Sequence, residues 1–239
     1  MKVAITFIGT NRYLNYLPKY YENIEKYFLP NTEKVILAFT DGELNDTPDN
    51  LKVYHQEHLE WPYITLKRFE IINKARAVID NMDWLVFLDA DAIPVTTITE
   101  EEFLKDKPLF GVHHPCHYLG MDPHTKAPGA YEQNPKCEAY VDVSKSLPPV
   151  YWQGCLWGGK VPYVCAMIDE LEARVNRDLE NDIVAVWHDE TQINRYFLER
   201  TQDVHTFSPS YAFPEVFESH CNFSPKIVHL AKDNSKYHK

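Results

Sequence analysis

The fold is indicated most directly by WLVFLDADA, which runs from Trp84 to Ala92. Its first five residues are apolar without alternation, as expected of a strand that is covered on both faces. Two aspartates, Asp89 and Asp91, follow where the apolar run stops. Ligands of parallel α/β sheets bind at the carboxyl ends of strands, so this segment predicts both a central strand and a site.

The preceding residues alternate between apolar runs and helical spacing. Short apolar runs predict strands over Val3–Ile8, Val35–Phe39 and Leu51–Tyr54. Apolar residues three and four positions apart predict helices over 14–28 and 65–80. This alternation predicts a Rossmann-like α/β fold, with a mostly parallel central sheet flanked by helices.

The second half of the chain has a mixed pattern. A strand is predicted over Leu109–His113, followed by a polar, proline-rich loop region up to about Pro149. A glycine-rich turn is expected at Gly158-Gly159, and helical spacing predicts helices over 162–176 and 189–200. Because no linker interrupts the chain, we expect one domain with an elaborated second half.

Composition limits the classes of partner. The 239 residues carry 24 Lys and Arg against 35 Asp and Glu, a formal net charge of −11. A nucleic-acid-binding face needs a basic surface, so this balance argues against nucleic acid as a partner. An anionic substrate would need local Lys, Arg or a metal ion to offset the repulsion.

The expected compartment follows from the cysteines and the apolar runs. Five cysteines without paired spacing are typical of small buried thiols in a reducing environment. The N-terminus is too polar after Ile8 for a signal peptide, and no apolar run approaches the length of a membrane span. We therefore expect a soluble, cytoplasmic protein.

Asp89 and Asp91 are the first candidate site. Past the end of a strand, two carboxylates at i and i+2 are free to turn toward one ion. Oxygen ligands of this kind suit Mg²⁺ or Mn²⁺, and such an ion can bridge a diphosphate. One alternative is a simple turn. Another is phosphoryl transfer through an aspartyl nucleophile, but that motif has Thr or Val where this chain has Ile93.

The second candidate is Trp187-His-Asp-Glu190, at the start of a predicted helix. The helix dipole and the unpaired amides of a helix N-terminus favour carboxylates, so one acid is expected to cap the helix. Capping does not explain Asp189, Glu190 and His188 together. If the segment faces a cleft, one carboxylate could stabilise positive charge on a reacting carbon, or attack it.

The third candidate is YWQGCLWGG, from Tyr151 to Gly159. Its three glycines let the backbone approach a ligand closely, or they form a tight turn. The aromatic side chains allow a different function, a non-catalytic carbohydrate-binding protein in which Tyr151, Trp152 and Trp157 stack on sugars.

Basic residues supply two further candidates. Lys67 and Arg68 stand near the start of a predicted helix, where a guanidinium and helix-end amides could meet phosphate together. A solvated helix face is the alternative. The C-terminus carries Lys226, Lys232, Lys236 and Lys239, a composition that would suit a tail folding over a diphosphate; a frayed tail is the default.

Taken together, these segments resemble the family 6 glycosyltransferases, which include the histo-blood-group A and B transferases and the α-1,3-galactosyltransferase. The order and spacing of the matching blocks extend through almost the whole chain. The block around WHDE is the most specific, and the Asp-x-Asp motif (DxD) is the least. The matching blocks are WPYITLKRF (Trp61–Phe69), FLDADA (Phe87–Ala92), YWQGCLWGG (Tyr151–Gly159), NDIVAVWHDETQINRYFL (Asn181–Leu198) and FSPSYAFPE (Phe207–Glu215).

The resemblance implies a nucleotide-diphospho-sugar transferase fold of the GT-A type, with residues 1–239 as a single catalytic domain. Residues 1–108 would form the nucleotide-binding half, and residues 109–239 the half for donor sugar and acceptor. The family reaction moves galactose or N-acetylgalactosamine from a UDP donor to O3 of a β-galactoside, retaining the α configuration. The implied partners are a UDP-sugar and a β-galactoside-type glycan, and the implied cofactor is Mn²⁺ or Mg²⁺.

The resemblance also implies roles for individual residues. Tyr13 would stack on uracil, Arg68 would contact donor phosphate or sugar, and Lys236 would close over the diphosphate. Asp89 and Asp91 would hold the metal ion, and Glu190 would be the catalytic carboxylate in the cleft. The implied donor-binding set is completed by Phe7, Ile8, Ala90, Gln153, Gly154, Cys155 and Asp189; the implied acceptor-binding set is His114, Cys116, His117, Trp187, His188 and Glu190.

Two departures from the family pattern leave specificity open. Gln153-Gly-Cys155 stands where the family reads the C2 substituent of the donor and matches no common version, with Cys155 favouring galactose slightly. The acceptor segment, His113 to Tyr118, lacks the paired Trp of the vertebrate enzymes, so acceptor identity is not fixed.

Three further points stay open on the sequence. Retention could follow from two inversions through a Glu190 adduct or from front-face attack guided by UDP. A metal-dependent UDP-sugar hydrolase is a further alternative function, and the sequence does not indicate the oligomeric state. The tail and the loop around residues 120–135 are expected to order on donor binding.

Overall fold

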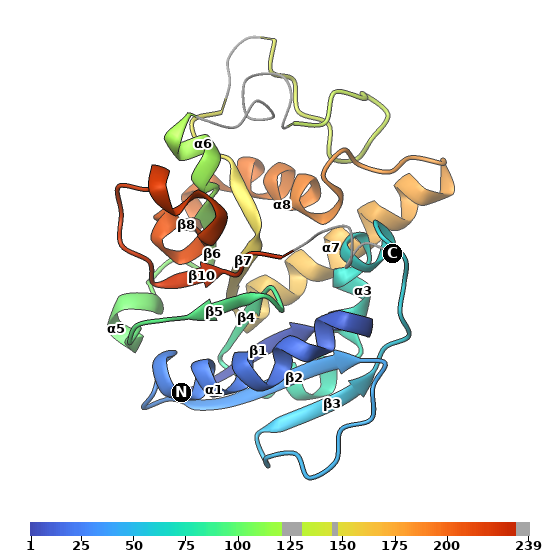
Figure 1. Cartoon of the computed structure of the whole chain (residues 1–239). Coiled ribbons are helices and arrows are strands. Elements are labelled where there is room, and N and C mark those ends of the chain that lie inside the picture. The colour runs from blue at the N-terminus through green and yellow to red at the C-terminus, as the bar shows by residue number, and fades with distance from the viewer. Residues whose placement is uncertain (121–130, 145–147, 233–239) are drawn as a thin grey trace.

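A computed structural model of the chain describes residues 1–120, 131–144 and 148–232. A seven-stranded sheet runs through the centre in the order β3-β2-β1-β4-β7-β6-β8, and helices pack on both of its faces (Figure 1). Side chains of the helix α1 (Leu17–Tyr27) contribute to the apolar cluster on one face. The helices α3, α7 and α8 contribute to the cluster on the other face.

The predicted strands of the first half are confirmed. They are β1 (Lys2–Ile8), β2 (Glu33–Thr40), β3 (Leu51–His55) and β4 (Trp84–Leu88). β1 pairs in parallel with both β2 and β4, and β2 pairs in parallel with β3. All five residues of β4 are buried, in agreement with its unbroken apolar sequence.

The helices of the first half are shorter than predicted. The periodicity over 14–28 is divided between a 3₁₀ helix, Asn11–Tyr16, and α1. The predicted helix over 65–80 is wrong as one element, because it consists of α2 (Tyr63–Leu66), α3 (Arg68–Asn73) and α4 (Arg76–Ile79).

The breaks in this segment have a local cause. Lys67 and Ala75 have ψ values of 16° and 12°, outside the helical region, so the axis changes direction at each of them. Each short helix can then turn its own apolar residues toward the sheet, and Leu66, Phe69 and Ile79 are all buried.

The glycine-rich segment is a strand, which corrects the prediction of a turn at Gly158-Gly159. β7 (Trp152–Lys160) runs antiparallel between β4 and β6 (Leu109–His113). A Cβ at Gly158 would lie 2.2 Å from the carbonyl oxygen of Leu85. The glycine is therefore required by the close approach of two backbones within the sheet.

The remaining elements complete the layers. β6 is confirmed as predicted, and β8 (Val204–Phe207) pairs with it in parallel, so the sheet is mostly parallel. The helices predicted over 162–176 and 189–200 are confirmed as α7 (Val161–Glu180) and α8 (His188–Glu199).

Where the structure describes it, the region predicted as a loop contains one short helix. α6 (Pro115–Leu119) follows β6, and residues 131–144 contain no helix or strand. Short elements elsewhere are α5 (Glu100–Phe103) and the 3₁₀ helices Thr201–Asp203, Pro209–Ala212 and Glu215–His220.

A second, three-stranded sheet was not predicted. It consists of β5 (Ala92–Pro94), β9 (Phe213–Pro214) and β10 (Ile227–His229) in the order β5-β10-β9. β10 runs antiparallel to β5, with His229 opposite Ala92. The amide of Leu230 donates to the carbonyl oxygen of Asp91 at 3.0 Å, so this sheet returns the end of the described chain to the Asp-x-Asp turn.

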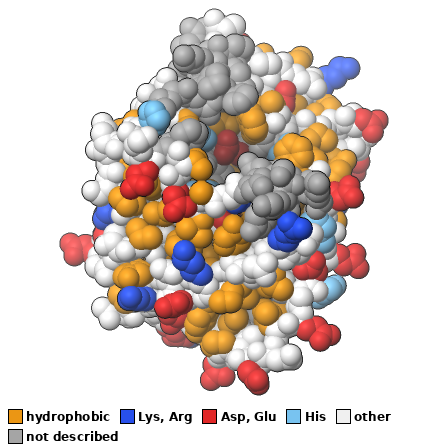
Figure 2. Space-filling view, viewed as in Figure 1, with side chains coloured by type: hydrophobic (Ala, Val, Ile, Leu, Met, Phe, Trp, Pro, Cys, Tyr) orange, Lys and Arg blue, Asp and Glu red, His pale blue; other side chains and the backbone are white. Residues whose placement is uncertain are grey.

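The structure locates the basic side chains and the cysteines. On the face shown in Figure 2, Lys and Arg side chains are scattered and form no continuous basic patch. Of the five cysteines, Cys137, Cys155 and Cys165 are buried. Within the described residues, no helix is both long enough and apolar enough to cross a membrane.

Candidate active site

Two adjoining cavities lie at the carboxyl end of β4. The first has a volume of about 210 Å³ and the second about 150 Å³. Thr65, Arg68 and Asp89 line both, so the two cavities form one continuous cleft. The cleft lies at the edge of the sheet where β1 and β4 end, and ligands of parallel α/β sheets bind at such carboxyl ends.

The first cavity contains several of the sequence-predicted residues. Ile8 and Tyr13 come from the end of β1 and the following 3₁₀ helix, and Ala90 comes from the turn after β4. Burial raises the pKa of Tyr13, so its phenol stays neutral and its ring forms part of the cavity wall. The residues that line this cavity without having been predicted as site residues are Thr10, His58, Leu59, Trp61, Ile64, Thr65, Phe87 and Lys232.

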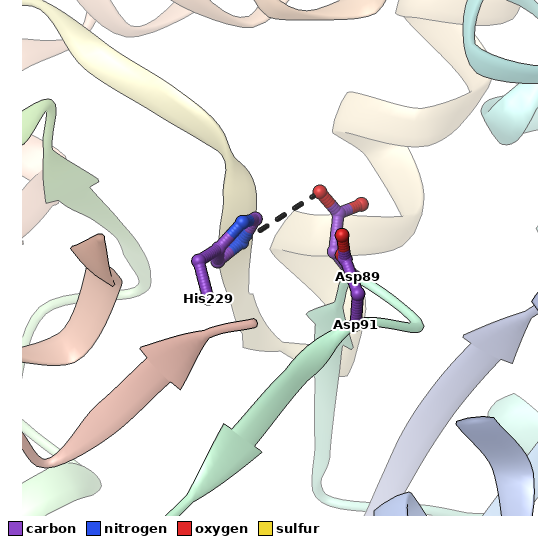
Figure 3. Close-up of side chains that lie close together, drawn as sticks. All are labelled: Asp89, Asp91 and His229. Carbon is purple, nitrogen blue, oxygen red and sulfur yellow. Dashed lines mark ion pairs between the residues drawn. The ribbon is translucent and has the colours of Figure 1, made fainter. Parts of the chain in front are cut away.

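The Asp-x-Asp turn is held rigidly between the two sheets. The amide of Asp89 donates to the carbonyl oxygen of Cys155 at 2.9 Å, and the amide of Ala92 donates to that of Asp89 at 3.0 Å. The carboxylates of Asp89 and Asp91 lie close together with the imidazole of His229, which comes from the end of β10 (Figure 3). One ligand atom from each of these residues lies within 4.8 Å of the others.

Positive charge surrounds this acidic pair. Lys232 forms an ion pair with Asp91, and its ammonium lies 4.8 Å from the centre of the Tyr13 ring. Burial raises the pKa of Asp91, but the charges of His229 and Lys232 lower it by more, so the net shift is downward. The side chain of Asp91 is 2% exposed, and it is therefore a buried carboxylate kept ionised by its neighbours.

Arg68 connects the two cavities. Its guanidinium contacts Asp89 Oδ1 at 2.8 Å and Asp189 Oδ2 at 2.7 Å, and it also donates to the carbonyl oxygen of Gly154 at 3.3 Å. Burial lowers the pKa of Arg68, but the charges of Asp189 and Asp89 more than compensate and raise it overall. One fixed cation thus bridges carboxylates that are 100 positions apart in the sequence.

The second cavity brings together the two acids at the start of α8. Asp189 is buried and paired with Arg68. Glu190 accepts a hydrogen bond from the hydroxyl of Tyr151 at Oε1 and another from the amide of Gly154 at Oε2, both at 2.8 Å. Burial raises the pKa of Asp189 and of Glu190 to about 7 in each case. The amide of Trp187, the N-cap residue, donates to the hydroxyl of Thr191 at 2.8 Å.

β7 supplies the opposite wall of this cavity. Gln153, Gly154 and Cys155 all line it. A Cβ at Gly154 would lie 3.1 Å from Cβ of Glu190, so a larger side chain there would press against the acid. Burial, and then the charge of Asp89, raise the pKa of the Cys155 thiol well above its ordinary value, which leaves it neutral.

Several predicted residues lie outside both cavities. Phe7 is in the core, with its ring 5.1 Å from that of Tyr20. His114 and His117 have rings 5.8 and 6.3 Å from that of Tyr151, the residue that bonds Glu190. Cys116 lies between them in the sequence, on α6. Trp187 and His188, by contrast, line the second cavity. Lys236 lies outside the described residues.

The aromatic segment is not a sugar-stacking surface. Tyr151, Trp152 and Trp157 are 2%, 3% and 0% exposed, and Trp157 stacks on Phe87 at 4.9 Å. The alternative of a carbohydrate-binding protein that uses these three rings is therefore wrong, because the rings are buried in apolar clusters of the interior.

Sequence reasoning missed His229 and Lys232 as site residues. Neither belongs to a recognisable motif, and their position depends on the pairing of β10 with β5. The only sequence signal was the basic C-terminal segment, which included Lys232 without distinguishing it from its neighbours.

A mixed α/β sheet with carboxylates at the carboxyl end of a central strand is the arrangement of a nucleotide-binding α/β enzyme. Comparison with known proteins narrows this class, because residues 1–238 match the sequence profile of glycosyltransferase family 6. The chain therefore belongs to glycosyltransferase family 6, whose fold is of the GT-A type.

Individual relatives match over most of the chain. The O-antigen biosynthesis glycosyltransferase WbnI of Escherichia coli is 26% identical over 240 residues, covering 100% of this chain and 98% of the relative. The histo-blood group ABO system transferase 2 of Rattus norvegicus is 25% identical over 239 residues, covering 96% and 68%. The globoside alpha-1,3-N-acetylgalactosaminyltransferase 1 of Homo sapiens is 24% identical over 224 residues, covering 90% and 62%.

Proposed function

We propose that this chain is a metal-dependent retaining transferase that moves galactose or N-acetylgalactosamine from a UDP donor to O3 of a β-galactoside, in α linkage. One observation carries the proposal: a single cleft holds Asp89 and Asp91 at one end, Asp189 and Glu190 at the other, and Arg68 between them. We take residues 1–239 as one catalytic domain. The relatives include an alpha-1,3-N-acetylgalactosaminyltransferase, which supports the proposed linkage and sugar class.

The first cavity suits the nucleotide. Tyr13 and Ile8 would face uracil, because an aromatic ring and an aliphatic side chain form one wall there. Arg68 and Lys232 would face the diphosphate, since both cations line the same cavity. Lys232 thus joins Lys236 as a candidate for the lysine that closes over the donor.

The residues at the Asp-x-Asp turn fit a divalent ion. Asp89 and Asp91 offer hard oxygen ligands, and each is paired with a cation, Arg68 or Lys232, so the turn is built to attract positive charge. A bound Mn²⁺ or Mg²⁺ would supply charge that stabilises the departing UDP. Arg68 would hold Asp89 in place and would also contact the diphosphate.

The second cavity suits the sugar. Gln153, Gly154 and Cys155 would face its C2 substituent, and the bulk of Cys155 favours galactose slightly over the N-acetylated sugar. Asp189 and His188 would hold sugar hydroxyls, because both line the cavity beside Glu190.

Glu190 would act at the anomeric carbon. Its two hydrogen bonds fix both carboxylate oxygens against β7, so it cannot swing away from the sugar without losing them. As an anion it would stabilise positive charge that develops on the carbon, or attack it to form a glycosyl adduct. Both routes retain the α configuration, and both require the ionised carboxylate.

The acceptor would enter beside α6 and the start of α8. The rings of His114 and His117 lie close to that of Tyr151, and Cys116 lies between the two histidines in the sequence. Because Tyr151 contacts Glu190, this segment adjoins the place where transfer would occur. Trp187 and His188 would complete the acceptor contacts.

A donor and acceptor panel tests the proposal. The protein is incubated with Mn²⁺, each of several UDP-sugars and a set of β-galactosides, and the products are read by mass spectrometry and linkage analysis. We expect an α-1,3-linked galactose or N-acetylgalactosamine on a β-galactoside. Equal UDP release with and without acceptor would instead identify a hydrolase. Transfer from none of the UDP-sugars would refute the proposal.

A further inference from the structure

His229 projects into the acidic pair from a different part of the chain. Its Nε2 lies 3.8 Å from Asp89 Oδ2, which is too long for a hydrogen bond (Figure 3). Ligand atoms of His229, Asp89 and Asp91 lie within 4.8 Å of one another. Two ligands that share one ion at about 2.2 Å are separated by at most about 4.4 Å, so these atoms need to close by only a few tenths of an ångström.

Within the described residues, one ring nitrogen of His229 is left without a hydrogen bond. Nε2 of His229 is buried and finds no hydrogen-bond partner there. Buried polar atoms are nearly always satisfied, and an unsatisfied one beside two carboxylates indicates a ligand that completes it.

The backbone places this nitrogen firmly. His229 pairs with Ala92 in the β10–β5 ladder, and the amide of Leu230 donates to the carbonyl oxygen of Asp91. The three candidate ligands are thus carried by one turn and one strand that are hydrogen-bonded to each other. Preorganisation of this kind favours metal binding, because little has to be ordered when the ion enters.

We propose that His229 is a third protein ligand of the divalent ion, and that it makes the site prefer Mn²⁺ to Mg²⁺. The inference rests on the proposed function only in taking the Asp-x-Asp turn as the metal site. Mg²⁺ prefers an all-oxygen shell with several waters, whereas imidazole suits transition metals. Replacing an oxygen ligand by nitrogen therefore penalises Mg²⁺ more than Mn²⁺.

Metal binding is measured directly on the whole chain. The affinity for Mn²⁺ and for Mg²⁺ is determined by calorimetry with and without UDP, for the natural chain, His229→Gln and His229→Ala. Exposed His220 provides the matched control, His220→Ala. Loss of residues that merely support metal ligands costs about 10- to 100-fold in affinity, so we expect His229→Ala to bind Mn²⁺ at least about tenfold more weakly. Mg²⁺ affinity should change less, and His220→Ala should match the natural chain.

A spectroscopic measurement needs no variant. Pulsed electron paramagnetic resonance of bound Mn²⁺ should show a nitrogen hyperfine coupling in the natural chain, and His229→Gln should abolish it. Thermal melting in EDTA checks that the variants fold. Unchanged Mn²⁺ affinity in both variants, or a natural chain without nitrogen coupling, would overturn the inference while leaving the transferase intact. Nitrogen-coupled Mn²⁺ in a protein that ignores UDP would refute the proposed function and leave His229 as a ligand.

Discussion

The two carboxylate pairs of the cleft are made of the same kinds of residue but are set to different charge states. Around Asp91, Lys232 and His229 lower the pKa of a carboxyl that burial alone would raise. Asp189 is also buried and Glu190 is partly buried. Among the described residues that line their cavity, Arg68 is the one Lys or Arg, and burial raises the pKa of each acid to about 7. Asp91 is therefore anionic at neutral pH, whereas Asp189 and Glu190 are close to half protonation.

This difference matches two different chemical tasks. A site for a divalent ion needs standing negative charge, which neighbouring cations can hold in place until an ion arrives. A carboxylate stabilises a transient positive charge most strongly in a poorly solvated pocket, because little water is present there to screen its electric field. The predictions below test the contrast between the two pairs, beginning with the largest effect.

Glu190→Gln should have the largest effect. The amide keeps the shape of the side chain but cannot carry negative charge, so we expect kcat to fall by about a thousandfold or more. UDP binding, measured by calorimetry, should stay within about twofold, because Glu190 does not line the first cavity. Glu180→Gln, at an exposed position near the end of α7, is the matched control. A Glu190→Gln enzyme that works at the natural rate would remove this residue from the mechanism.

Removing the metal, or one of its ligands, should come next. We expect EDTA, or the substitution Asp91→Asn, to lower the transfer rate about a hundredfold, and added Mn²⁺ to restore the EDTA-treated enzyme but not the variant. UDP affinity should fall in the same experiments, in contrast with Glu190→Gln. Transfer that continues unchanged in EDTA would show that Lys232 and Arg68 alone serve the diphosphate.

Tyr151→Phe should have a smaller effect of a distinctive kind. The substitution removes the 2.8 Å hydrogen bond to Glu190 and leaves the ring in the core. Because that bond stabilises the ionised carboxylate, its loss should raise the pKa of Glu190 further. We expect kcat to fall about tenfold at neutral pH, and the acidic limb of its pH profile to move to higher pH.

The neighbouring phenol supplies the control for that experiment. Tyr131 donates to the carbonyl oxygen of Val150 and packs on Tyr151, but it does not contact Glu190. Tyr131→Phe should leave the pH profile in place even if it weakens folding. Parallel profiles for the natural chain and Tyr151→Phe would mean that the hydroxyl does not tune the acid.

The two carboxylate pairs also differ in how well they could be predicted from the sequence. Asp89 follows an unbroken apolar strand, so both its location and its chemistry were legible from adjacent residues. Asp189 and Glu190 could be predicted as acids at a helix start, but their positions depend on distant contacts. Asp189 contacts Arg68 across 121 positions, and Glu190 contacts Gly154 across 36. Local patterns contain no information about such contacts.

The same limit explains the errors in the fold. β7 looked like a turn because Gly158-Gly159 usually marks one, yet the glycines are required by the close backbones of β4 and β6. His229 and Lys232 were missed because the small sheet of β5, β9 and β10 is made of strands two or three residues long. Strands this short have no detectable periodicity, and only pairing in three dimensions defines them.

The smallest expected effect is on the pH dependence of stability, which tests the same contrast between the two carboxylate pairs. A carboxyl whose pKa is raised from 4.5 to about 7 costs stability as it ionises in the folded state, so Glu190 should make the natural chain progressively less stable between those pH values. His113, His188 and His205 have lowered pKa values, with burial as the first cause, and they act in the opposite direction. The informative quantity is therefore the difference in unfolding free energy between Glu190→Gln and the natural chain.

As the pH rises from about 4.5 to 7, the unfolding free energy of Glu190→Gln should increase relative to that of the natural chain by on the order of 1 kcal/mol. Urea unfolding at a series of pH values measures it. For Asp91→Asn the sign is opposite, because the lowered pKa of Asp91 stabilises the natural chain above its ordinary value of 3.8 and is lost only in stronger acid. If the Glu190→Gln difference stayed constant with pH, Glu190 would be an ordinary ionised carboxylate, and the two pairs would not differ in the way that their surroundings indicate.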